Sequence, residues 1–398
     1  MSSKGWKKYK LEDIAEIVGG GTPSTANSDY WGGEIPWLTP RDLSINQNRF
    51  VCHGERNITK LGLENSSAKL LPAGSILLTS RAPIGYLAIA SNPICTNQGF
   101  KSLIPNTQIV DGLFLYYLLR NNVDYLKSVG VGTTFAEISG GVLRQLEFDF
   151  PDLPTQRQIA ETLSALDDKI ELNRQTNATL EAIAQAIFKE WFVDFRYPGA
   201  TGEMVDSELG PIPKGWRVGK LGEVCRVTMG QSPPGVSYNE DGIGTPFFQG
   251  RADFDFRFPR KRVFTTDPRR FANKFDTLVS VRAPVGDMNI AAENCCIGRG
   301  LAAVLEKNGC YSFTYYFLKE LSEQFKNFED SGTVFGSINK RDFEDLTCII
   351  PNIEIITSYE EKCRVIDDEI FICEQESRTL TIIRDAILPK LMNSEIEL

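Results

Sequence analysis

The feature that most constrains this 398-residue chain is an internal repeat with a period of about 200 residues. The sequence R-A-P-[IV]-G begins at Arg81 and occurs again at Arg282. Further matches follow in the same order along the chain: Trp6 with Trp216, Pro151 with Pro351, and Asp167-Asp168 with Asp367-Asp368. Matches in a conserved order imply that one structural unit is built twice.

The two copies have diverged unevenly. Their offset stays at 200 residues through the C-terminal part of each copy, whereas it varies through the N-terminal part. Residues 24–75 and 234–275 hardly resemble each other. Insertions and substitutions concentrate in surface loops. The pattern therefore predicts a common scaffold with one divergent region, as expected of a framework that recognises two different targets.

Each copy ends in a segment with the spacing of a long helix. Residues 155–195 contain neither Pro nor Gly, and seam positions spaced 4, 3, 4, 3 run from Ile159 to Trp191. The second copy repeats this spacing from Tyr359 to Leu391, with Pro389 near its end predicting a kink or fraying. Such heptad seams require a partner helix, and each helix is expected to be roughly 60 Å long.

The partner could be the other copy or another chain, and we favour an antiparallel pair within the chain. Antiparallel packing places Asn173 against Ser377 and Asn177 against Cys373, because these polar residues interrupt the two seams at matching positions. A buried polar layer of this kind fixes the register of a helix pair.

The remaining segments predict mixed α/β domains. Short apolar runs at Ser75–Thr79 and Leu87–Ala90 are typical of strands, and Leu113–Leu126 and Phe313–Phe325 are typical of amphipathic helices. The predicted fold class is α+β with a pseudo-twofold internal repeat. Its predicted parts are a first globular domain at 1–151, a central helix at 152–198, a linker at 199–215, a second globular domain at 216–351 and a C-terminal helix at 352–398.

The charge is distributed unevenly. A formal net charge of −9 and a pI of about 5.0 argue against nucleic-acid binding when taken alone. Residues 152–195 and 353–398, however, carry −4 and −6, which leaves the globular domains near neutral. Residues 251–274 contain eight basic and three acidic residues with interleaved phenylalanines. This cluster fits either a solvated surface or a set of phosphate contacts. The corresponding region of the first domain contains fewer basic residues.

Several classes of protein are disfavoured. The only histidine is His53, none of the nine cysteines forms a CxxC pair, and no P-loop or other catalytic constellation is present, so we expect neither an enzyme nor a metal site. No apolar stretch has the length of a membrane span, and no signal peptide is recognisable, so we expect a cytoplasmic location away from membranes. The Gly19–Thr25 loop fits a plain turn or a functional loop. Arg81 and Arg282 fit either DNA contacts or structural ion pairs.

The sequence between the copies resembles a known family. The stretch FKEWFVDF at Phe188–Phe195, followed by SELGPIPKGW at Ser207–Trp216, resembles the central region of type I restriction–modification specificity subunits. The stretch IPWLTPRDL at Ile35–Leu43 and the repeated R-A-P-x-G turn are also similar to that family. The resemblance extends over essentially the whole chain. The second copy reaches Leu398 without a Trp-Phe-x-Asp-Phe stretch, so the two partner-docking surfaces need not be identical.

The resemblance implies a non-catalytic subunit with two target recognition domains, each reading one half of a bipartite asymmetric site in double-stranded DNA. It implies that the two helices set the half-site spacing and dock two methyltransferase subunits, and that motor-nuclease restriction subunits complete the complex. The resemblance assigns S-adenosylmethionine and ATP to those partner subunits, with no cofactor in this chain. The alternative is a protein–protein scaffold whose two end domains read no DNA sequence.

Candidate residues follow from these expectations. The candidate DNA-binding residues are Thr22, Ser24, Thr25, Arg41, Arg81, Gln98, Lys101, Thr134, Gln231, Ser232, Gln249, Arg251, Arg260, Lys261, Arg282, Arg299 and Lys340. The candidates for partner docking or coiled-coil register are Asn173, Asn177, Trp191, Phe192, Cys373 and Ser377.

Overall fold

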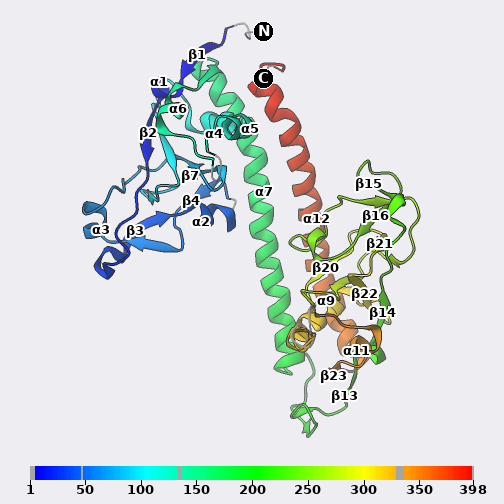
Figure 1. The fold of residues 1–398 in the computed structure, drawn as a ribbon. Helices are drawn as coiled ribbons and strands as arrows, with labels where there is room; N and C mark the ends of the chain where they lie inside the picture. The colour runs from blue at the N-terminus through cyan, green and yellow to red at the C-terminus, as the bar shows by residue number, and fades with distance from the viewer. Residues whose placement is uncertain (1–4, 46–47, 133–135, 329–335, 397–398) are drawn as a thin grey trace. The chain divides into compact units, whose positions relative to one another are not determined.

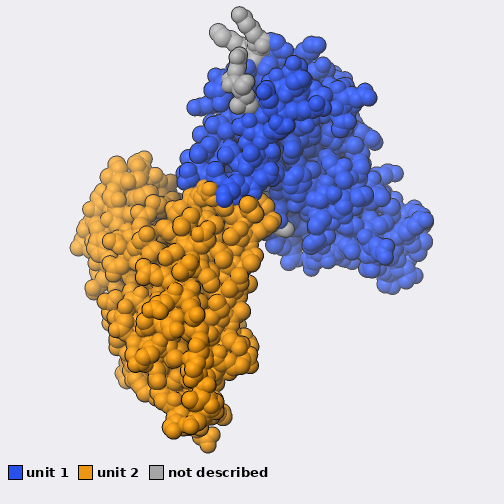
Figure 2. All heavy atoms as spheres, turned by 180° about the vertical axis from the view of Figure 1, so that it is seen from behind, with its two compact units in different colours: residues 1–170, 378–398 blue, residues 171–377 orange. Residues whose placement is uncertain are grey.

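The chain divides into two compact units in a computed structural model that describes residues 5–45, 48–132, 136–328 and 336–396. Unit 1 comprises residues 1–170 and 378–398, and unit 2 comprises residues 171–377 (Figure 2). Two long helices, α7 (Leu153–Phe188) and α12 (Ile353–Met392), contribute to both units (Figure 1). The sequence predicted globular and helical segments as separate parts. In the structure, each compact unit consists of one globular part together with a segment of both long helices.

Unit 1 is built on a sheet with the strand order β2–β9–β6–β7–β4. Its strands are β2 (Ala15–Gly19), β9 (Lys101–Pro105), β6 (Ile76–Ser80), β7 (Ile84–Ala90) and β4 (Phe50–Val51). Strand β6 is buried along its whole length, which explains why its sequence is a continuous short run instead of an alternating one. The smaller sheets are β5 (Arg56–Ile58)–β3 (Trp31–Leu38)–β8 (Cys95–Thr96) and β1 (Lys7–Lys10)–β10 (Glu147–Phe150).

Unit 2 repeats this topology. The order β14–β22–β19–β20 matches β2–β9–β6–β7, with β14 (Cys225–Met229), β22 (Leu301–Glu306), β19 (Thr277–Ser280) and β20 (Met288–Ile290). The pair β13 (Arg217–Lys220)–β23 (Thr347–Ile350) matches β1–β10, and β16 (Thr245–Phe248) lies parallel to β21 (Cys295–Ile297) as β3 lies parallel to β8. The remaining strands are β15 (Tyr238–Asn239), β17 (Phe264–Thr265), β18 (Phe271–Ala272), β11 (Met204–Val205) and β12 (Ile212–Pro213). The mixed α/β prediction is thus confirmed for both copies.

The shorter helices also correspond between the units. Unit 1 contains α1 (Leu11–Ile14), α2 (Pro40–Ile45), α3 (Lys60–Glu64), α4 (Gly112–Asn121), α5 (Val123–Ser128) and α6 (Gly140–Gln145). Unit 2 contains α8 (Leu221–Val224), α9 (Tyr311–Glu320), α10 (Ser322–Lys326) and α11 (Lys340–Glu344).

The prediction of one helix over Leu113–Leu126 is wrong. Helix α4 ends at Asn121, and Asn122 leaves the helical conformation while its Nδ2 donates to the Leu118 carbonyl at 2.8 Å. An asparagine side chain offers the backbone this alternative partner, which favours a break that an apolar pattern cannot reveal. Unit 2 has the same break at Leu321, between α9 and α10.

Within unit 2, segments of α7 and α12 lie side by side and run antiparallel. Asn173 Nδ2 donates to Ser377 Oγ at 3.2 Å, and the Tyr359 hydroxyl donates to the Ala184 carbonyl at 3.3 Å. Asn177 Nδ2 donates to Glu374 Oε1 at 2.9 Å, where the heptad pattern had placed Cys373. The carboxylate is the stronger acceptor for the amide, so the longer Glu374 side chain makes the contact.

The proline in the second long helix does not end it. Helix α12 continues past Pro389 to Met392, and in unit 1 the buried side chains of Leu388 and Leu391 belong to the same core as Ile159 and Leu163 of α7. Burial of this apolar seam stabilises the last turns, so the prediction of fraying at Pro389 is not met.

A buried arginine ties the globular part of unit 2 to both helices. The Arg257 side chain is fully buried and forms ion pairs with Asp367 of α12 and Glu181 of α7. It also donates to the Tyr316 hydroxyl at 2.9 Å and lies 3.9 Å from the ring centroid of Tyr315. Arg257 therefore holds unit 2 together, although the sequence had grouped it with a surface basic cluster.

Unit 1 has an equivalent arrangement around Arg49. This side chain pairs with Asp168 of α7 and donates to the Tyr117 hydroxyl at 2.9 Å. Tyr117 in turn donates to Asp167 at 2.7 Å, and Arg384 of α12 pairs with Asp167 at 2.6 Å. The acidic pairs that repeat in the sequence thus lie on the two long helices. In each unit they contribute to a buried cluster of Arg, Tyr and Asp side chains, here called the anchor, which joins the globular part to the helices.

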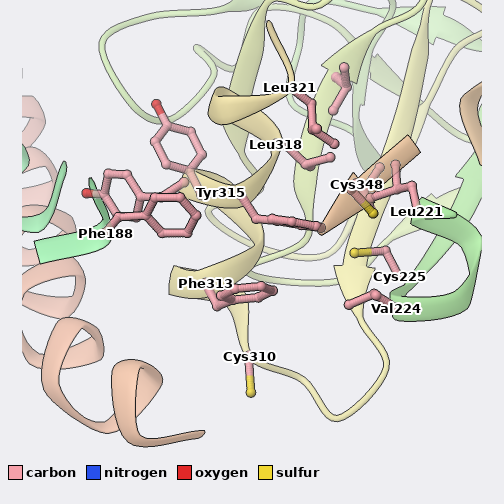
Figure 3. Close-up of a cluster of buried hydrophobic side chains, with 14 of the residues drawn as sticks. Phe188, Leu221, Val224, Cys225, Cys310, Phe313, Tyr315, Leu318, Leu321 and Cys348 are labelled. Carbon is pink, nitrogen blue, oxygen red and sulfur yellow. The ribbon is translucent and has the colours of Figure 1, made fainter. Parts of the chain in front are cut away.

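The end of α7 is held by aromatic packing within unit 2. Phe188 lies in the core near Phe313 of α9 (Figure 3), with ring centroids 6.1 Å apart. Trp191 and Phe192 follow in a π-helical turn at Lys189–Val193, and their ring centroids lie 5.9 and 5.2 Å from that of Tyr359. The aromatic residues after α7 therefore form part of the unit 2 core.

Helix α9 receives its N-terminal cap from another helix. Cys310 provides no side-chain cap, whereas the Glu360 carboxylate of α12 accepts hydrogen bonds from the backbone N–H of Phe313 at 3.0 Å and of Ser312 at 3.4 Å. Burial raises the pKa of Glu360 to about 7, against the opposing effect of these two hydrogen bonds.

The first prediction concerns the anchor. Arg257→Met should lower the free energy of unfolding by about 3–5 kcal/mol, because it leaves the Asp367 carboxylate buried without its counter-ion, whereas Glu181 keeps its ion pair with Lys319. Chemical denaturation of the full chain measures the change. Arg270→Met is the control, since Arg270 is exposed in the same segment and should shift stability by less than about 0.5 kcal/mol. Equal effects of the two substitutions would show that the anchor is not a stabilising contact.

The second prediction concerns pH. Because the folded-state pKa of Glu360 lies above its ordinary value of 4.5, its contribution to stability is present below pH 4.5 and is lost as pH rises through 7. The loss amounts to at most about 3 kcal/mol. Glu360→Gln should therefore be more stable than the wild type at pH 8, and this difference in stability should become smaller at pH 5. Denaturant unfolding at the two pH values measures the difference. Glu361→Gln, an exposed neighbour, should leave the pH profile unchanged; a profile equally unchanged for Glu360→Gln would contradict the account.

Candidate nucleic-acid interface

The two R-A-P-x-G turns share one hydrogen-bonding design. In unit 1 the Thr79 hydroxyl donates to the Pro83 carbonyl at 2.7 Å and accepts from the Tyr86 backbone N–H at 2.9 Å. In unit 2 Ser280 makes the same two bonds, to Pro284 at 2.8 Å and from Asp287 at 2.9 Å. The hydroxyl residues were not among the candidates, although a Thr or Ser two residues before the repeated arginine was a visible signal.

The glycine in each turn is required by its surroundings. Gly286 has a φ of +95°, and a Cβ placed there would lie 2.6 Å from Phe325 Cβ of α10. Gly85 has a φ of +102° and a similar close neighbour in Val123. The turns are thus packed against α5 in unit 1 and α10 in unit 2. This packing holds Arg81 and Arg282 in fixed positions.

In each unit a loop contacts the R-A-P-x-G turn through Gly99 or Gly300, and the glycine loop packs against that loop in turn. Gly230 packs so closely that a Cβ would lie 2.1 Å from the Gly298 carbonyl oxygen, and the backbone N–H of Arg299 donates to Ser232 Oγ at 3.3 Å. In unit 1 Thr22 Oγ1 donates to Gln98 Oε1. The glycine loops are therefore packed elements that bring together Thr22 with Gln98 and Ser232 with Arg299.

In unit 2 five candidate residues meet around two cavities. A cavity of about 410 Å³ is lined by Arg282, Arg299 and Lys340, and another of about 220 Å³ by Gln249, Arg251 and the same two arginines. Arg282 and Arg299 are exposed and have no side-chain partner among the described residues. Lys340 lies 3.5 Å from Glu344 and Arg251 lies 2.6 Å from Asp287. The concave surface carries an excess of positive charge suited to phosphate or to a guanine edge.

In unit 1 the corresponding arginine is paired. Arg81 Nη1 lies 3.5 Å from Glu137 Oε2, and Lys101 Nζ lies 3.4 Å from Glu137 Oε1. Of the two interpretations open for the repeated arginine, the ion pair applies in unit 1, whereas Arg282 has no such partner. Thr134 lies outside the described residues.

Other candidate residues lie apart from these cavities. Ser24, Thr25 and Gln231 are exposed on their loops, and Arg41 is exposed on α2. Arg260 pairs with Asp255 and Lys261 with Glu293, each at 2.5 Å. Six of the eight basic residues at 251–274 are paired with acids, namely Arg251, Arg257, Arg260, Lys261, Arg262 and Arg269. Several of these acids come from outside the segment, so local charge counting overstated the basic cluster.

The register and docking candidates lie inside unit 2. Asn173, Asn177, Cys373 and Ser377 are at the contact between α7 and α12, where Asn173 also donates to the Cys373 carbonyl at 3.3 Å. Trp191 and Phe192 are each only 7% exposed, so their side chains stabilise the core and offer little surface to a partner.

The described ranges contain neither a metal-binding cluster nor a membrane-spanning helix. No three His, Cys, Asp or Glu side chains there are grouped to hold a metal ion, and none of the helices there has the length and apolar character to cross a membrane. The nine cysteines are free thiols, and eight of them are buried.

Comparison with known proteins identifies the fold. The crystal structure of a type I restriction–modification system S subunit from M. genitalium matches with a TM-score of 0.64, covering 97% of this chain and 96% of that chain at 18% identity. The chain therefore has the fold of that class of protein, with both copies of the unit present.

The sequence comparisons give the family. The profile of the "Type I restriction modification DNA specificity domain" matches residues 3–182 and again 213–363. The chain is 35% identical to the type I restriction enzyme MjaIX specificity subunit of Methanocaldococcus jannaschii, covering 99% of this chain and 94% of the relative. It is 25% identical to the HindI specificity subunit of Haemophilus influenzae, covering 98% and 99%. The chain belongs to the family of type I restriction–modification DNA specificity subunits, as its sequence predicted.

The third prediction tests the packed glycine loop. Gly230→Ala should lower the free energy of unfolding by about 1–3 kcal/mol, because the added methyl group overpacks against the Gly298 carbonyl. Thermal or chemical unfolding of the full chain measures the effect. Gly235→Ala, five residues along the same loop, is the control, since a Cβ there meets nothing within 4 Å. Equal free energies of unfolding for the two variants would contradict close packing at Gly230.

Proposed function

We propose that this chain is a non-catalytic subunit that reads a bipartite asymmetric site in double-stranded DNA. Each globular part, residues 1–151 and 216–351, is proposed to read one half. The observation that carries the proposal is a repeated loop arrangement, in which a middle loop at Gly99 or Gly300 contacts both the R-A-P-x-G turn and the glycine loop of its unit. The neighbouring residues 24–75 and 234–275 differ between copies. Phosphate contacts supply affinity, and side chains from the divergent segments supply base readout.

We further propose that α7 and α12 form an antiparallel coiled coil that sets the half-site spacing and docks two methyltransferase subunits. The support is that both helices contribute to both units and that their segments run antiparallel where Asn173 meets Ser377. Motor-nuclease restriction subunits complete the proposed complex. S-adenosylmethionine and ATP are proposed to bind those partners.

A protein scaffold without DNA reading is the second candidate. It is favoured by the pairing of most basic residues at 251–274 with acids, which leaves little of that cluster free. The salt dependence of DNA binding separates the two functions. Neutralised phosphates release counterions and give a steep decrease in affinity with salt, whereas a scaffold gives no such slope.

The fourth prediction tests the proposed function by domain exchange. Replacing residues 1–151 with the matching domain of another family member should change one half of the recognised site and leave the other half and the spacing unchanged. Mapping of methylated adenines in cells that express the hybrid with its methyltransferase subunits measures this. Exchange of residues 216–351 is the reciprocal control. A change in both halves from either exchange would contradict the proposal.

A further inference from the structure

The two R-A-P-x-G turns pair with the chain in the same backbone geometry, but the side chains around them differ in charge. Arg81 forms an isolated β-bridge with Glu137, and Arg282 forms the same bridge with Ser337. The next residue in each copy repeats a further contact: Ile138 N–H donates to the Ser80 carbonyl at 2.9 Å, and Ile338 N–H to the Val281 carbonyl at 3.1 Å. Glu137 and Ser337 therefore occupy equivalent positions, one acidic and one neutral.

In unit 1 the acid occupies the space between two cations. Glu137 uses one carboxylate oxygen for Arg81, at 3.5 Å, and the other for Lys101, at 3.4 Å. The Lys101 side chain is only 18% exposed, so this cation is directed inward to the carboxylate instead of into solvent. A single carboxylate thus pairs with both cations and reduces the charge of this group from +2 to +1.

In unit 2 the same space is open. The cavity of about 410 Å³ beside Ser337 is lined by Arg282, Arg299 and Lys340, and none of the described residues that line it is acidic. Arg299 stands where unit 1 has the neutral Gln98, because Gly300 and Gly99 follow them in matching loops. Unit 2 also has Ala302 where unit 1 has Lys101. The substitutions between the copies thus replace one cation with two others and remove the acid in unit 2.

We propose that Arg282, Arg299 and Lys340 form a phosphodiester-binding site in unit 2, and that in unit 1 the Glu137 carboxylate occupies the equivalent anion position as an internal competitor for DNA phosphate. Guanidinium groups bind phosphate and carboxylate oxygens with the same fork geometry, which is why one anion can replace the other. The inference rests on the proposed DNA-reading function.

The two units are therefore expected to contribute unequally to the affinity for DNA. Unit 2 provides the larger share of the salt-dependent affinity, because Arg282 and Arg299 have no side-chain partner among the described residues and can replace counterions of the DNA on binding, while Lys340 also faces Glu344 at 3.5 Å. Unit 1 contacts its half of the site through a loop whose cations are partly neutralised. The polar pair Thr22 and Gln98 adjoins this loop, because the Ser80 N–H donates to the Gly99 carbonyl at 2.8 Å.

The fifth prediction exchanges the two residues at the equivalent position. In the full methyltransferase complex bound to its cognate duplex, Glu137→Ser should steepen the dependence of log affinity on log salt by about one unit, since one further phosphate contact contributes about 0.9. Ser337→Glu should make it shallower by about the same amount. Between 50 and 200 mM salt, each slope change corresponds to about a three- to fourfold change in relative affinity. Glu147→Ser is the control, because it removes an exposed acid from β10 without touching either loop.

Two outcomes would overturn the inference. Unchanged salt slopes in both variants, with a steep wild-type slope, would show that the position binds no phosphate. A loss of discrimination at one base pair of the unit 1 half-site in Glu137→Ser would show that the carboxylate reads a base amino group. Failure of the proposed function is distinguishable, because the wild-type complex would then bind without a salt slope or without sequence preference.

Discussion

The buried contact between an arginine of each globular part and the acids of the long helices is the interaction on which the rest of the structure depends. Arg257 has no exposure to solvent, so its charge is balanced only by Asp367 and Glu181. The same balance around Arg49 fixes unit 1 to its helix segments. Buried ion pairs add little stability over apolar packing, yet they strongly disfavour any arrangement in which a partner is missing. They therefore specify where each globular part lies relative to the helix segments of its own unit.

On this common frame, the copies differ in the side chains around the R-A-P-x-G turns. The turns that carry Arg81 and Arg282 are held by equivalent hydroxyl groups and equivalent glycines. The side chains around them differ in charge, with Glu137 in one copy and an open cationic cavity in the other. A duplicated scaffold with independently varied loops is an economical way to read two unlike half-sites, since the packed elements need no change when a loop does.

The repeat, the two helices and the mixed α/β class could be predicted because they rest on patterns that are local or periodic. The role of Arg257 could not, because its partners Glu181 and Asp367 are 76 and 110 residues away along the chain. The same reason explains why the basic cluster at 251–274 was overestimated, since acids such as Glu293 come from other elements. Of the candidate site, the arginines, the glycine loops and Lys340 were identified from sequence. The neutralising role of Glu137 required the structure, because it depends on the approach of Lys101 from another strand.

The central claim is that two units of one design read two different half-sites for partner enzymes. Mapping methylated adenines across a genome that expresses this chain with its methyltransferase subunits, with and without the gene for this chain, tests the claim most directly. The account predicts methylation only when the chain is present, at a site of two unlike short sequences separated by a spacer of constant length. Methylation that persists without the chain, or that occurs at a single uninterrupted sequence, would contradict it.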